Sequence, residues 1–80
     1  MKNYEEALNL IERTDRLIRL QATGTAKELA LTLGISRISV CRLFKDLRDM
    51  GAPVKYNRNR RTYYYEYPIE IIITCKIVIL

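Results

Sequence analysis

The sequence predicts a mainly α fold with a small β-hairpin, in one domain over residues 1–80. Apolar residues recur every three or four positions through about the first 50 residues, which is typical of amphipathic helices. After Pro53 the spacing changes to every second residue, which is typical of strands. With 49% hydrophobic side chains among 80 residues, the chain has enough apolar surface for one modest core.

The first helix is predicted from about Tyr4 to Ala22. Its apolar stripe consists of Ala7, Leu8, Leu10, Ile11, Leu17 and Ile18. The polar segment 13–16 interrupts this stripe. The N-terminal half of the helix therefore has two interpretations: it covers the end of the core, or it contacts a partner helix in a dimer.

A second helix is predicted to begin after Thr25. Thr25 is followed three residues later by Glu28, the spacing of a capping box. Gly34 follows the last apolar position and favours the positive φ that ends a helix. The apolar residues Leu29, Ala30 and Leu33 share one face of this helix.

A third helix is predicted from Ser36, a good N-cap, to about Met50, with Gly51 as its end. Ile35 is expected to fill the corner between the two helices. Two helices joined by a short turn with a glycine form a helix-turn-helix, which presents its second helix to a DNA major groove. Val40, Phe44 and Leu47 are predicted to face the core, and the opposite face carries Arg37, Ile38, Cys41, Arg42 and Lys45.

A hairpin is predicted after the third helix, with strands over 54–56 and 62–67 and a polar turn over 57–60. Such a hairpin is a wing, whose tip here carries Arg58, Arg60 and Arg61. Tyr63, Tyr65 and Tyr67 share one strand face, which is expected to pack on the helices.

Residues 69–80 form an apolar tail rich in β-branched residues, which predicts an additional C-terminal strand. Exposed and unpaired, such a strand would aggregate. It is therefore expected to join the hairpin sheet, to pair with the same strand of a second chain, or to bind another protein. We expect a homodimer, formed through residues 69–80, the first helix or both.

The net charge of +5 is concentrated in residues 36–65, which carry +6, whereas residues 1–35 sum to zero. The basic excess thus belongs to the third helix and the wing, where a DNA backbone would be met. We expect Arg37 to recognise guanine, Ile38 to contact a thymine methyl group, and Ser39, Arg42 and Lys45 to anchor phosphates. The alternative function is a protein-interaction module of the same fold, which would not need this charge.

Other functions are disfavoured by the residues that the sequence lacks. It has no His, and Cys41 and Cys75 are far apart, so neither a usual zinc site nor a His-based catalytic site is predicted. We expect no enzyme activity and no cofactor. Without a signal peptide or an apolar stretch long enough to span a membrane, we expect a cytoplasmic protein without membrane contact.

Residues 12–67 resemble a known family. The segments KELA, LGIS and LRDMGAPV, together with Arg42 in the middle of the third helix, are similar to the winged helix-turn-helix domain of bacterial repressors of the biotin-repressor and deoxyribose-operon-repressor types. The chain looks closer still to small stand-alone bacterial helix-turn-helix proteins. Cys41 and Leu43 depart from the usual Tyr and Asp, so the base preference of the family is not transferred.

The resemblance implies a regulator of transcription that binds double-stranded DNA. Larger members of the family have an effector domain after the wing, where this sequence has a dozen apolar residues, so we expect no small-molecule effector. It places DNA contacts on the second helix of the predicted pair, on the start of the first, and on the wing. These positions are Thr25, Lys27, Ser36, Arg37, Ile38, Ser39, Cys41, Arg42, Lys45, Arg58, Arg60 and Arg61.

Overall fold

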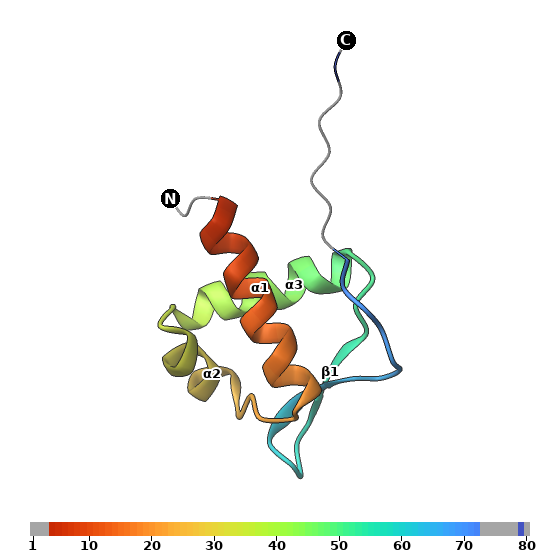
Figure 1. Ribbon diagram of the computed structural model, residues 1–80. Coiled ribbons are helices and arrows are strands. Elements are labelled where there is room, and N and C mark those ends of the chain that lie inside the picture. Colours follow the sequence, from red (N-terminus) through yellow and green to blue (C-terminus); the bar gives the residue numbers. More distant parts are fainter. Residues whose placement is uncertain (1–3, 73–78, 80) are drawn as a thin grey trace.

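The computed structural model describes residues 4–72 and 79, and their side chains from residue 5 onward. Three helices are followed by an antiparallel hairpin: α1 (Tyr4–Arg19), α2 (Ala26–Leu33), α3 (Arg37–Asp49), β1 (Val54–Asn57) and β2 (Thr62–Tyr65). Helix α1 crosses in front of α3, with α2 on one side and the hairpin below (Figure 1). This arrangement is winged-helix-like and confirms the predicted fold class.

Each helix ends in the same backbone arrangement, in which a residue with positive φ closes two hydrogen bonds back into the last turn. Gly34 (φ 70°) and Gly51 (φ 101°) serve α2 and α3, as predicted. In α1 this residue is Gln21 (φ 51°), and the Ala22 amide donates to the Leu17 carbonyl at 2.9 Å. Helix α1 therefore ends at Arg19 rather than near Ala22, because a residue other than glycine takes the left-handed conformation.

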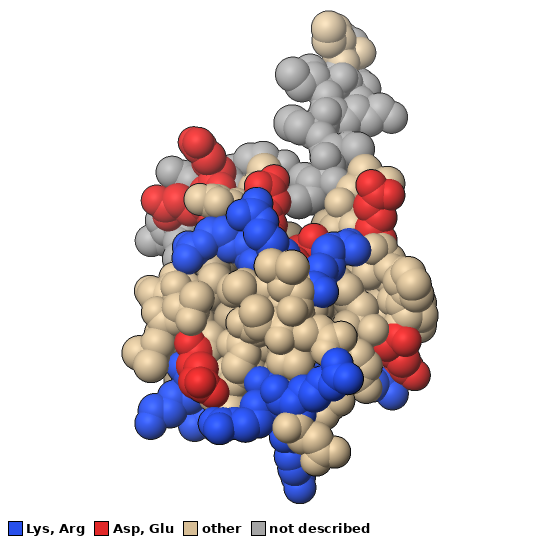
Figure 2. Space-filling view, turned by 60° about the horizontal axis from the view of Figure 1, so that its bottom comes forward, with Lys and Arg blue, Asp and Glu red and all other residues tan. Residues whose placement is uncertain are grey.

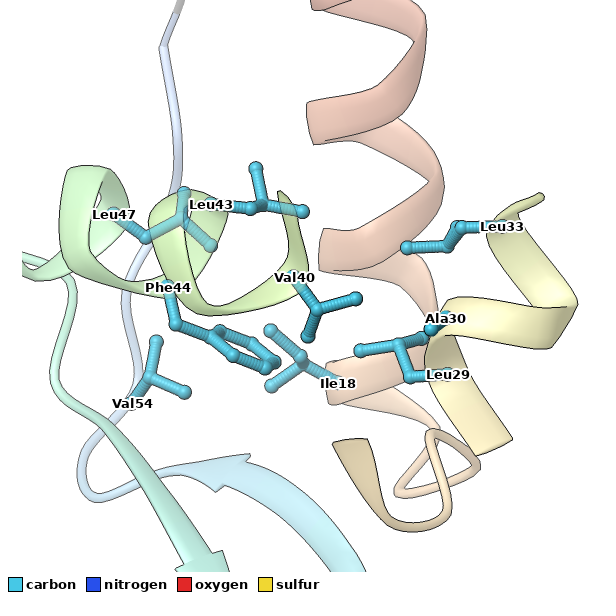
Figure 3. Close-up of a cluster of buried hydrophobic side chains, with 9 residues drawn as sticks. All are labelled: Ile18, Leu29, Ala30, Leu33, Val40, Leu43, Phe44, Leu47 and Val54. Atoms are coloured by element: carbon cyan, nitrogen blue, oxygen red, sulfur yellow. The ribbon is translucent and has the colours of Figure 1, made fainter. Parts of the chain in front are cut away.

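One hydrophobic core joins all three helices to β1 (Figure 3). The predicted core residues Val40, Phe44 and Leu47 of α3 are buried. Leu43 is buried as well, so the apolar face of α3 is wider than predicted. Among the residues that the structure describes, the buried hydrophobic side chains are Ile18, Leu29, Ala30, Leu33, Val40, Leu43, Phe44, Leu47 and Val54.

The polar segment that interrupts the α1 stripe attaches α1 to the hairpin. Thr14 is fully buried and donates to the Leu10 carbonyl at 2.7 Å. Asp15 accepts from the Tyr65 hydroxyl at 2.6 Å and from Arg19 Nε at 2.9 Å. Burial, followed by the hydrogen bond to Asp15, raises the pKa of Tyr65 well above its usual value. The phenol thus stays a neutral donor to the carboxylate.

A second attachment holds the hairpin to the loop between α1 and α2. The hydroxyl groups of Thr23 and Thr62, both buried, lie 3.0 Å apart, and the Tyr63 amide donates to Thr23 Oγ1 at 2.8 Å. Tyr63 packs against the core, as predicted. Tyr67 does not: it is 57% exposed, because β2 ends at Tyr65 and the chain bends before Tyr67.

The predicted C-terminal strand is not formed by residues 69–72. The carbonyl of Ile69 accepts from Arg19 Nη2 at 2.6 Å, and Ile71 packs against the core. These contacts to the helices take the place of strand pairing. Residues 73–78 and 80, on which the rest of that prediction falls, lie outside the described residues.

None of the helices within residues 4–72 is long and apolar enough to cross a membrane.

Candidate nucleic-acid interface

Two serine side chains form the cap at the N-terminus of α3. Ser36 Oγ accepts from the Ser39 amide at 3.1 Å and lies 2.9 Å from Ser39 Oγ. Ser36 is therefore the N-cap, as predicted. Ser39, predicted to contact phosphate, is half-buried and occupied by this cap.

Apart from Ser39, the predicted DNA-contacting residues of α3 are exposed, but they do not share one face. At about 100° per residue, Arg37 and Arg42 point about 140° apart, whereas Ile38 and Lys45 lie within about 20° of each other. Ile38 and Lys45 therefore form the outer crest of α3, with the two arginines on opposite sides of it. Ile38 is 68% exposed, a high value for a large apolar side chain.

The side of α3 that faces α1 carries Ser39, Arg42 and Asp46, which we call the α1-facing flank. Arg42 and Asp46 line a groove of about 260 Å³ together with Leu10 and Ile11 of α1. Arg42 thus stands between an apolar groove and the solvent, with a carboxylate one turn away.

The opposite side of α3 carries Arg37, Cys41 and Arg48, which we call the hairpin-facing flank. Burial raises the pKa of the Tyr63 phenol, Cys41 and Tyr56 raise it further, and the positive charges of Arg48 and Arg37 lower it. These four side chains therefore lie within electrostatic reach of one tyrosine of the hairpin. Arg48 Nε also donates to the Val54 carbonyl at 3.2 Å, which holds β1 against this flank.

Lys45 is less available than the sequence suggested. Its amine lies 2.8 Å from Asp49 Oδ2, and both side chains are exposed. An exposed pair of this kind contributes little to stability. The Asp49 carboxylate nevertheless compensates the positive charge that Lys45 would offer to a phosphate.

The hairpin turn is organised by Asn57, whose side-chain oxygen accepts from the amides of Asn59 (2.9 Å) and Arg60 (3.0 Å). Of the three wing arginines, Arg60 donates to Gln21 at 3.0 Å and Arg61 lies 3.4 Å from Glu28. Arg58 is exposed and has no hydrogen-bond or ion-pair partner among the described residues. The turn therefore lies against the corner between α1 and α2, with one arginine free.

The start of α2 belongs to the same corner. The predicted capping box is formed: the Glu28 amide donates to Thr25 Oγ1 at 3.2 Å, and the Thr25 amide donates to Glu28 Oε1 at 3.1 Å. Hydrogen bonding from Thr25 to the Glu28 carboxylate, chiefly from the Thr25 amide, lowers the pKa of Glu28, and the charge of Arg61 lowers it further. Thr25 is thus committed to the cap, and Lys27 is exposed beside it. Arg60 and Arg61 are brought to this end of the fold by their contacts with Gln21 and Glu28.

Tyr56 and Arg48 are neighbours of the predicted site that the sequence did not indicate as such. A signal was present, since Tyr56 lies two residues after the buried Val54 and so shares its strand face. Basic side chains gather in two bands, separated by uncharged surface, on the face seen in Figure 2.

Comparison of the chain with protein-family models, with curated proteins and with solved structures gave no match. The family resemblance of residues 12–67 therefore stays a prediction.

Proposed function

We propose that this protein binds double-stranded DNA sequence-specifically and regulates transcription. Helix α3 would enter the major groove and the hairpin turn would meet the backbone or the minor groove. The observation that carries the proposal is the exposed outer side of α3, where the apolar Ile38 stands on the crest and an arginine lies on each side. A major groove about 12 Å wide admits one helix presented in this way.

The first two turns of α3 are the part suited to reading bases. Asp46 and Asp49 lie in its last turns, where they would repel phosphates, whereas the residues from Ser36 to Arg42 include no acid. In helix-turn-helix complexes the N-terminal residues of the recognition helix contact the base edges. Ile38 is placed for a thymine methyl group, and Arg37 and Arg42 for the bases or phosphates beside it.

The test is binding of the pure protein to a labelled duplex over a range of salt concentrations. If roughly five phosphates are neutralised, log affinity falls with log salt concentration at a slope of about −4 to −5. Selection from random duplexes then gives the preferred sequence. Absence of duplex binding at low salt would contradict the proposal and favour the protein-interaction module.

We propose further that two copies act together. The apolar stripe of α1 is only half-buried at Leu8, Leu10 and Ile11, and Ile72 is 75% exposed. Two copies would place their α3 helices in successive major grooves about 34–36 Å apart, on an inverted repeat.

Sedimentation of the full chain at micromolar concentration is expected to give a dimer. A variant ending at Ile72 keeps the packed Ile71 and separates the two candidate interfaces. It stays dimeric if α1 forms the contact and becomes monomeric if the tail does. A full chain that sediments as a monomer would contradict dimerisation.

A further inference from the structure

The hairpin-facing flank of α3 is a continuous line along the helix. Arg37 and Arg48 are eleven residues apart, which brings them within about 20° of each other around the axis. The hairpin packs on this line, because Arg48 bonds the Val54 carbonyl and lies over the Phe44 ring at 5.8 Å. The flank and the hairpin therefore form the two walls of one surface.

Three aromatic rings in contact with one another form the rim of this surface. Phe44 in the core stacks on Tyr63 with ring centroids 4.1 Å apart, and Tyr63 contacts Tyr56 at 4.8 Å. Tyr56 is the outermost of the three and is 38% exposed. The Tyr56 ring is thus held in place by a chain of ring contacts that begins in the core. The Tyr56 hydroxyl would therefore lose little conformational freedom on binding a ligand.

Two hydrogen-bond donors at this rim, Tyr56 and Arg37, have no partner among the described residues. The Tyr56 hydroxyl has no hydrogen-bond partner there, in contrast to that of Tyr65, which donates to Asp15. Arg37 likewise has no hydrogen-bond or ion-pair partner there and is exposed. A neutral donor and a full positive charge therefore stand on one side of α3, both open to solvent.

The α1-facing flank has a different charge. Asp46 lines its groove beside Arg42, and Ala7, which lines the same groove, follows Glu5 and Glu6 directly in α1. Carboxylates disfavour the approach of a phosphate backbone. The two flanks of α3 are thus unequal, and the one facing the hairpin is the more favourable for an anionic strand.

We propose that one sugar–phosphate strand of the DNA lies along the hairpin-facing flank of α3, and that the Tyr56 hydroxyl donates a hydrogen bond to a phosphate beside Arg37. This inference rests on the proposed DNA binding and adds a contact that the sequence did not predict. Tyrosine hydroxyls are among the groups that contact DNA phosphates. Since such contacts carry no base information, Tyr56 adds affinity for every sequence.

The test compares Tyr56→Phe with wild type on a labelled mixed-sequence duplex at low salt. Phenylalanine keeps the ring contact with Tyr63 and removes only the hydroxyl. Loss of one hydrogen bond to a charged group is expected to weaken binding roughly tenfold. The salt slope is expected to stay unchanged, because no charge is removed. Thermal melting of both proteins should coincide.

Tyr64→Phe is the matched control. Tyr64 neighbours Tyr63 on β2 and therefore points to the other face of the hairpin, where Lys55 pairs with it across the strands. It is expected to bind the duplex as tightly as wild type.

Three results would overturn the inference. If wild type does not bind the duplex, both the proposed DNA binding and the Tyr56 contact are wrong. If wild type and Tyr56→Phe bind equally tightly, DNA binding is supported and only the Tyr56 contact is wrong. An equal loss in Tyr64→Phe also removes it, because the effect would then not depend on the flank.

Discussion

Replacing Phe44 with alanine is expected to lower the free energy of unfolding by about 3–5 kcal/mol, the usual cost of truncating a buried phenylalanine. Phe44 is 3% exposed and stacks on Tyr63, so the truncation opens a cavity between α3 and the hairpin. Small domains are stabilised by about 5–15 kcal/mol in total. The variant is therefore expected to lose much of its stability. The hairpin also loses the ring contact of Tyr63 with α3.

Urea unfolding followed by circular dichroism measures this loss. Phe44→Leu is expected to cost less, because it fills most of the volume. Leu31→Ala on the exposed side of α2 is the control: Leu31 is 76% exposed, and its truncation should stay within about 0.5 kcal/mol of wild type. An unfolding midpoint for Phe44→Ala equal to that of wild type would show that this core is not what stabilises the fold.

The double variant Arg37→Ala/Arg42→Ala is expected to weaken duplex binding at least tenfold at about physiological salt, since each bidentate arginine contact is worth about 1–3 kcal/mol. If both arginines contact phosphates, the salt slope becomes less negative by about 1.8, or about 0.9 for each contact. Both side chains are exposed, so the melting temperature should stay close to that of wild type. Gel shift and salt titration measure the two effects.

Lys45→Ala is the control for that double variant. It removes one positive charge from the same helix, but this charge already lies 2.8 Å from Asp49. Its effect on duplex affinity is expected to be smaller than that of either arginine alone. Unchanged binding by the double variant would show that α3 is not the DNA-binding surface.

The helices were predictable because their signals are local. The Thr25–Glu28 box, the Ser36 cap and the positive φ of Gly34 each depend on residues within one or two turns of the chain. The alternation after Pro53 likewise predicted the hairpin. The end of α1 was missed because Gln21 does not mark a helix end in a sequence.

The contacts that place the hairpin were not predictable, since they join residues far apart in the chain. Asp15 and Tyr65 are separated by 50 residues, and Thr23 and Thr62 by 39. Spacing in the sequence showed that segment 13–16 breaks the apolar stripe of α1, but only the fold shows what contacts it.

The candidate site was predictable where it depends on local spacing, and its contacts with the hairpin were not. Helical spacing alone separates Arg37 from Arg42 around α3. Which of them faces the hairpin depends on how β1 packs. The compensation of Lys45 by Asp49 is local, and the pairing of Arg61 with Glu28 requires the folded turn.

The corner between α1 and the hairpin turn also contains backbone strain. Gln21 (φ 51°) and Arg61 (φ 54°) are the non-glycine residues with positive φ in the described chain. The left-handed conformation costs such residues roughly 1–2 kcal/mol each. Strain of this kind persists where the surrounding structure holds it in place, commonly at sites that bind a ligand. Gln21 also closes the end of α1 and accepts from Arg60 at 3.0 Å, so this strain is stored at Arg61 and beside Arg60, two of the arginines that would meet DNA.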